Sequence, residues 1–318
     1  PYVAALPEDT LFLIASGSPL PAESVLVKRF EERHIRNDFV SVPYLRYRLT
    51  NDRASRVKAL LEKNTGAAVN TDLRPRGYYY NFLYWVSVFH LRFAKVLAIV
   101  GKIPLGFVIL GFLFCILMPR AFLGRRALAG TAMAAGGFSL MSAEIILIYG
   151  YQVFYGDLYY KIAWIIAAFM AGMALGTWFA GRRPVQAEEL TLGWLHAGAA
   201  FYFLLLAGLF RVLPQKLIQP AGLGEGFFLA AALLIGGLVG FEFPCAVRFF
   251  LAENRSGEPK TGTIYAADLL GSSFGALVSA GFLIPVYGIF KTLFLLEVLN
   301  LALCGLLFFG KNLGRKHV

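Results

Sequence analysis

Long apolar runs recur along the sequence after residue 96, and polar residues gather in the short stretches between them. Seven runs stand out, at about residues 97–118, 128–152, 162–181, 191–210, 226–247, 263–285 and 292–310. Each is close to the roughly 20 residues that a helix needs to cross a bilayer. Short connections favour antiparallel neighbours. The pattern predicts a mainly α-helical, polytopic membrane bundle of about seven spans over residues 97–318, surrounded by a lipid bilayer.

The first part of the chain has shorter elements. An apolar run of strand length at residues 10–16 ends at a Gly-Ser-Pro turn, and an amphipathic helix is expected after Pro21. A short strand around residues 39–42, stopped by Pro43, and a second amphipathic helix over residues 52–63 complete the pattern. Alternating strands and helices are typical of α/β folds. We therefore expect residues 1–77 to be the C-terminal portion of a larger α/β domain.

A polar turn and an aromatic segment connect these two parts. The side chains of Asn70 and Asp72 can bond to nearby backbone, and Arg74 can pair with Asp72 or with a ligand. A rigid turn and a ligand site both remain open at this stage. Tyrosines and a tryptophan then crowd residues 78–85, as in the aromatic belt at a membrane surface. Residues 78–96 are accordingly predicted to form an interfacial amphipathic linker helix.

Composition and charge sharpen this division. Hydrophobic residues make up 58% of the 318 residues and charged residues 15%, against roughly 25% charged in soluble domains. The net charge is +11, but the cations of the second part lie in loops between apolar runs. Eleven Lys and Arg follow the odd-numbered spans and four follow the even-numbered ones. This asymmetry is typical of membrane orientation rather than nucleic-acid binding. The three cysteines have no metal-ligand spacing, so no metal is predicted.

Acidic residues inside the apolar runs are the candidates for chemistry. Glu144, Glu242 and Asp268 each lie within a predicted span, where a charged side chain costs roughly 2.5–3.5 kcal/mol or more. We expect them to line one internal polar site, with Pro244 freeing a backbone carbonyl near Glu242. Such a site would suit a cation, for example a polyamine. The alternative is that the acids are protonated or paired with cations at span ends and only fix the helix register.

Small residues recur at four-residue spacing in the same runs. Gly172 with Gly176, and Gly271 with Gly275, form pairs that let helix backbones approach closely. Packing within one bundle and dimerisation both fit this pattern, so the oligomeric state stays open.

Several segments together resemble the membrane-fused, spermidine synthase-like family. The segments are Leu11–Ser16, Arg36–Tyr44 and Asn70–Pro75 in the first part, and Ser139–Gln152, Ala171–Arg183 and Ile264–Ala276 in the second. The resemblance implies a Rossmann-like domain, and aminopropyl transfer from decarboxylated S-adenosylmethionine to a polyamine acceptor. The family's glycine-rich loop and catalytic aspartate have no counterpart in this sequence. We therefore expect the catalytic half to precede residue 1, the catalytic residues to be unknown, and this chain alone to be inactive.

Two further expectations follow from the resemblance. A multi-pass protein of the bacterial cytoplasmic (inner) membrane is implied, and a cytosolic co-substrate would place the first part in the cytoplasm. Seven spans with the basic loops inside would place it outside instead, unless residues 79–100 form an eighth span. Gly172–Gly176 followed by Arg182 and Arg183 is also similar to a basic loop of major facilitator transporters, although the acidic residue of that loop is missing. The alternative function is thus transport of a cationic or polyamine solute, with a non-catalytic synthase-like module.

Overall fold

The computed structural model describes residues 2–7, 11–35, 37–50, 52–63, 69–123, 126–156, 159–184, 188–216, 221–253 and 261–313. The chain divides into two compact units, residues 1–69 and residues 70–318, and each is described by itself. The division falls at the polar turn that begins with Asn70.

The described residues of the N-terminal unit form a β-hairpin and three helices. Strands β1 (Tyr2–Pro7) and β2 (Leu11–Ser16) pair antiparallel, in a register that joins Tyr2 to Ser16. Helices α1 (Glu23–Glu32), α2 (Val42–Thr50) and α3 (Asp52–Lys63) follow. The strand at residues 10–16 and the helices after Pro21 and over 52–63 are confirmed. The described strands of this unit are antiparallel, so the parallel sheet of a Rossmann-like fold is not among its described elements.

The strand expected around residues 39–42 is wrong, because this segment starts a helix. The side-chain carbonyl of Asn37 accepts hydrogen bonds from the amides of Phe39 and Val40, which forms a local turn. The Ser41 hydroxyl then accepts a bond from the amide of Tyr44 at 3.4 Å, as an N-cap residue does. Pro43 lies in the first turn of α2, where its missing amide hydrogen costs nothing. Local side-chain bonds thus prevail over the β-branched residues that suggested a strand.

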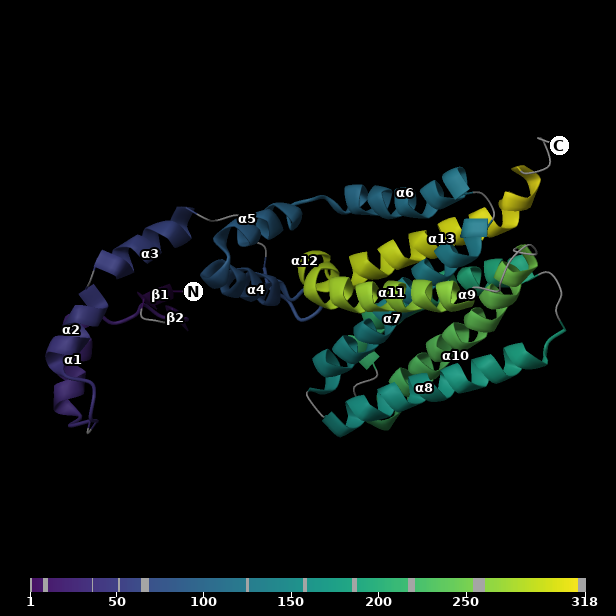
Figure 1. The fold of residues 1–318 in the computed structure, drawn as a ribbon. Helices are drawn as coiled ribbons and strands as arrows, with labels where there is room; N and C mark the ends of the chain where they lie inside the picture. Colours follow the sequence, from purple (N-terminus) through teal and green to yellow (C-terminus); the bar gives the residue numbers. More distant parts are fainter. Residues whose placement is uncertain are drawn as a thin grey trace. The chain divides into compact units, whose positions relative to one another are not determined.

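Among the described residues of the second unit, six helices are long and apolar enough to cross a membrane, which confirms six of the predicted spans. They are α7 (Arg126–Tyr155), α8 (Tyr159–Arg182), α9 (Glu188–Lys216), α10 (Ala221–Glu253), α11 (Thr261–Val278) with its continuation to Tyr287, and α13 (Ile289–Leu313). The continuation consists of a π-helical turn, η1 (Ser279–Leu283), and the short helix α12 (Ile284–Tyr287). The chain is therefore a multi-pass membrane protein, and the helices are drawn in Figure 1.

The segment before α7 departs from the prediction. Instead of one interfacial helix over 78–96 and one span over 97–118, the chain forms α4 (Arg76–Phe89), α5 (Leu91–Val100) and α6 (Leu105–Leu123). Helices α5 and α6 meet at an angle of 93°, as a broken span or a re-entrant segment would. The break lies at a glycine and a proline, Gly101 and Pro104, which interrupt helical backbone.

An eighth span over residues 79–100 is also wrong. Helices α4 and α5 are separate, and the Tyr79 hydroxyl donates to the carbonyl of Leu97 at 2.7 Å, so the two helices fold against each other. Helix α4 has 14 residues and α5 has 10. At about 1.5 Å per residue, each is too short for the roughly 30 Å hydrocarbon core.

The membrane helices associate most extensively as three pairs, α7 with α11, α8 with α10, and α9 with α13. In the second pair, a Cβ atom added to Gly172 or Gly176 would collide with the backbone at Leu233 or Gly237 of the facing helix. In the first pair, one added to Gly271 or Gly275 would collide with the backbone at Ala134 or Phe138. The predicted small-residue positions thus lie at close backbone contacts within this chain. In each of these two pairs the numbers of the contacting residues rise together along both helices, so the two helices of the pair run in the same direction.

Candidate functional site

A buried carboxylate lies at the centre of the bundle, on helix α10. The side chain of Glu242 is only 3% exposed. Its carboxylate rests against the backbone of α7 at Gly136, where an added Cβ atom would be 2.7 Å from Glu242 Oε2. Carbon and oxygen atoms pack no closer than about 3.0–3.5 Å, so a larger residue at position 136 would displace the Glu242 carboxylate from the place it occupies.

A histidine and an asparagine extend the polar site to helices α9 and α13. His196 Nδ1 is 2.9 Å from Asn300 Oδ1, and Asn300 Nδ2 donates to the carbonyl of Leu296 at 2.8 Å. That second bond turns the amide oxygen of Asn300 toward the ring, so Nδ1 of His196 carries the hydrogen and donates it. Nε2 is then the unprotonated nitrogen of the neutral ring. It faces Glu242 Oε1 at 3.6 Å.

The gap between His196 and Glu242 has a chemical consequence. Neither Nε2 of His196 nor Oε1 of Glu242 has a hydrogen-bond partner among the described residues. Both atoms are buried, where an unsatisfied polar atom costs roughly 1–3 kcal/mol. A proton on either residue would satisfy both atoms once the 3.6 Å gap closes to hydrogen-bonding distance. The pair is thus arranged to exchange a proton or to accept a positive charge.

Asp268 lies beside Glu242, on helix α11. Its Oδ1 atom is 3.4 Å from the Ser272 hydroxyl, one helical turn away. A Cβ atom added to Gly137 would be 2.7 Å from Asp268 Oδ1 and from Ser272 Oγ. The neighbouring glycines Gly136 and Gly137 of α7 therefore make room for one carboxylate each, and the two acids are close enough to interact electrostatically.

These side chains form one polar layer, which we define as Glu242, Asp268, Ser272, His196 and Asn300. Each of the three helix pairs contributes one titratable residue to it. The layer lies roughly 10–15 Å along the helices from one end of the bundle. That is the end with Arg182, Arg183 and Arg248, where the odd-numbered spans finish. A layer of this kind inside hydrocarbon is a candidate functional site by the rule for intramembrane titratable residues.

Glu144 occupies a different level of the bundle. It is buried on α7, seven residues beyond Gly137 and hence about 10 Å further along the helix axis. Its carboxylate has no hydrogen-bond or ion-pair partner among the described residues. The nearest polar feature on the α7–α11 seam is a pair of hydroxyls, with Ser279 Oγ 2.7 Å from Ser142 Oγ. Of the three acids predicted for one site, the structure brings Glu242 and Asp268 together and leaves Glu144 apart.

The candidate turn of Asn70, Asp72 and Arg74 contacts the membrane helices. Asn70 Oδ1 accepts from the amide of Gly77 at 2.8 Å and fixes the start of α4. The carbonyl of Asp72 accepts from the Tyr149 hydroxyl at 2.9 Å. The carbonyl of Leu73 accepts from the amide of Ile289 at 3.0 Å. No ion pair joins Asp72 to Arg74 among the described residues. These contacts dock the turn on the end of the bundle opposite the basic loops.

His196 and Asn300 were not predicted, although the sequence carries a signal for both. Each is a polar residue inside an apolar run, at Trp194–Ala200 and Leu295–Leu303. The rule that selected the three acids applies equally to polar and ionisable side chains. Among the described residues, no group of three or more His, Cys, Asp or Glu side chains is arranged to hold a metal ion.

Comparison of the chain with protein-family models, curated proteins and solved structures finds no match. The resemblance to spermidine synthase-like proteins stays a prediction, as do the co-substrate and the bacterial inner membrane. The geometry of the polar layer is therefore the basis for the proposed function.

Proposed function

We propose that this protein is a membrane transporter for a small cation, and that the polar layer binds the cation or the proton exchanged for it. One observation carries the proposal: the three helix pairs bring the buried Glu242 and His196 and the half-buried Asp268 to one layer. Carboxylates held in hydrocarbon without a fixed cationic partner favour a mobile positive charge. A proton or an ammonium group would neutralise them.

The arrangement supports exchange rather than permanent binding. Asn300 holds the His196 ring in the orientation that presents Nε2 to Glu242. Because the ring is neutral in this tautomer, it can take the proton that leaves the carboxyl group when a cation arrives. Asp268 remains beside the site and compensates the second charge of a dication. Glu242 is then the cation-binding residue, His196 the proton acceptor and Asn300 a positioning residue.

Aminopropyl transfer is a prediction separate from the transport proposal. The described residues of the first unit form a hairpin and three helices. The synthase-like activity stays a prediction, and the transport proposal does not depend on it.

Uptake into proteoliposomes tests the proposal. We expect the purified protein to carry radiolabelled 1,4-diaminobutane into vesicles faster than protein-free vesicles do. Glu242→Gln keeps the shape of the side chain but cannot ionise, so uptake should fall at least tenfold, a loss equivalent to about 1.4 kcal/mol of transition-state stabilisation. Asp268→Asn should lower uptake in the same direction.

Glu297→Gln is the matched control. Glu297 is also an acid within a span, but its side chain has no described contact with the polar layer. Its uptake should equal that of the unmodified protein. The proposal is refuted if Glu242→Gln and Asp268→Asn both transport normally while remaining folded. It is also refuted if the unmodified protein in sealed vesicles carries neither the diamine nor protons.

A further inference from the structure

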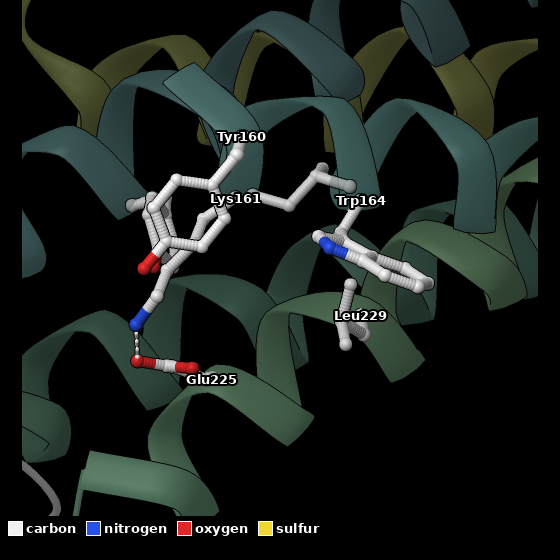
Figure 2. Close-up of a pocket in the computed structure, with 7 residues that line it drawn as sticks. Tyr160, Lys161, Trp164, Glu225 and Leu229 are labelled. Carbon is white, nitrogen blue, oxygen red and sulfur yellow. Dashed lines mark hydrogen bonds and ion pairs between the residues drawn. The ribbon is translucent and has the colours of Figure 1, made fainter. Parts of the chain in front are cut away.

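A second polar site lies at the opposite end of the bundle, between the start of α8 and the start of α10. It is a half-open cavity of about 350 Å³. Its lining includes three aromatic side chains, Tyr151, Tyr160 and Trp164, with Leu229 across from them. One carboxylate, that of Glu225, and one ammonium group, that of Lys161, face each other inside it (Figure 2). The cavity therefore combines aromatic walls with one acid.

Lys161 occupies the place where a ligand cation would lie. Its ammonium group contacts the carboxylate of Glu225, and it lies 5.9 Å from the ring centroid of Tyr160. Figure 2 shows the side chain of Lys161 extending past Tyr160 to Glu225. An ammonium within about 6 Å of an aromatic ring is attracted by the ring's negative face. The side chain of lysine is itself a primary alkylammonium, so this contact shows which ligand chemistry the walls accept.

One buried hydroxyl group lies beside the ammonium group of Lys161 in the wall of this cavity. Tyr151 is 2% exposed, and its hydroxyl interacts with the Lys161 ammonium group without reaching full hydrogen-bonding geometry. Buried hydroxyls normally have a partner. An alkylammonium offers three N–H donors, of which Glu225 accepts one and leaves others for this hydroxyl.

An aromatic belt at the membrane surface explains only part of this arrangement. Tyr160 and Trp164 are mostly exposed, as belt residues are. Tyr151 is not, because it lies inside the bundle against Phe228, with ring centroids 5.5 Å apart at 90°. A salt bridge that merely joined α8 to α10 would require neither the buried Tyr151 hydroxyl nor the remaining cavity.

We propose that this cavity is a binding site for primary alkylammonium ligands, with Glu225 as the counter-ion and Lys161 as a tethered competitor that keeps the site closed. It goes beyond the proposed function, since it lies at the other end of the bundle from the polar layer. The cavity proposal is tested by ligand binding to the solubilised protein, which does not require transport. A failed transport assay therefore does not refute the cavity proposal, and a failed binding assay does not refute the transport proposal.

Lys161→Met should open the site, because methionine keeps an apolar chain of similar reach but has no charge. The probe is n-butylamine at neutral pH, titrated calorimetrically into the purified, detergent-solubilised protein, with n-butanol as the uncharged comparison. We expect the variant to bind n-butylammonium roughly tenfold or more tightly than the unmodified protein does, and n-butanol equally weakly in both.

The double variant Lys161→Met, Glu225→Gln should lose the gain, because the counter-ion is removed. Lys291→Met is the matched control, since Lys291 is an exposed lysine at the start of α13, at the same end of the bundle. It should bind as the unmodified protein does. Equal affinity of Lys161→Met and the unmodified protein would overturn the proposal, and so would full binding by the double variant. If Lys161→Met does not fold, Lys161→Gln replaces it with the same expected results.

Discussion

The seam between α8 and α10 allows a quantitative prediction about Gly240. A Cβ atom added there would lie 2.7 Å from the Cα and carbonyl carbon atoms of Met173 on α8. Carbon atoms pack at about 3.5–4.0 Å, so Gly240→Ala has to separate two backbones by roughly 1 Å. Unlike the end of a side chain, the Met173 backbone cannot move without the rest of its helix. The substitution therefore disturbs the whole pair.

The expected cost of Gly240→Ala follows from two losses and one gain. Overpacking costs about 1–3 kcal/mol. The bond from the Thr177 hydroxyl to the Gly240 carbonyl, 2.9 Å long, is weakened, which costs about 0.6 kcal/mol in membrane helices. Alanine recovers up to about 1 kcal/mol of helix propensity. Gly208 supplies the matched control, because an added Cβ there meets nothing within 4 Å and only the propensity gain remains.

Thermal unfolding in detergent, followed by circular dichroism, measures the difference. We expect Gly240→Ala to be less stable than Gly208→Ala by about 2–3 kcal/mol, which corresponds to roughly 4–10 °C in Tm. Gly172→Ala, on the other side of the same seam, should shift the Tm in the same direction. If Gly240→Ala and Gly208→Ala unfold at the same temperature, the close backbone contact between α8 and α10 is not what holds this pair together.

Two further predictions concern the turn at residues 70–75. The turn docks at the end of the bundle opposite the basic loops, which are expected to face the cytoplasm. In a variant without native cysteines, Val69→Cys should therefore react with an impermeant maleimide from outside the cell, whereas Pro184→Cys should react only after permeabilisation. The reverse labelling would place the first unit in the cytoplasm. Tyr149→Phe removes the bond to the Asp72 carbonyl and should speed amide exchange in the turn by roughly fivefold, equivalent to about 1 kcal/mol. Tyr159→Phe, at a residue 85% exposed, should change nothing, and unchanged exchange in Tyr149→Phe would show that the bond does not hold the turn.

Run length alone predicts six of the membrane helices, because a backbone in hydrocarbon must satisfy its own hydrogen bonds over a fixed thickness. The remaining predicted span, over residues 97–118, was misplaced for a reason visible in the sequence. Residues 91–120 are as apolar as the other runs, but Gly101 and Pro104 break the helix. Hydrophobicity averaged over 20 residues is hardly changed by two helix-breaking positions. In the first unit, the side chains of Asn37 and Ser41 fix the start of α2 through local hydrogen bonds. The alternation of apolar and polar residues that suggested a strand carries no information about such bonds.

The candidate site was predictable in its residue types but not in its assembly. Burial of Glu242 and partial burial of Asp268 follow from their place in apolar runs. Their partners depend on which helices pair, since His196 and Asn300 are separated by more than a hundred residues and meet only because α9 packs on α13. The same dependence separates Glu144 from the other acids, because its level is set by the register of α7 against α11.

The three helix pairs also define where this molecule can move. Interdigitated backbones at Gly172, Gly240 and Gly271 oppose sliding within a pair, so α8 with α10 and α7 with α11 behave as stiff struts. The joints between struts are then the softer places, and the polar layer lies at such a joint. We therefore expect a change in the angle between two struts to alter the separation of Glu242 from His196 and from Asp268 before it alters the contacts within a pair.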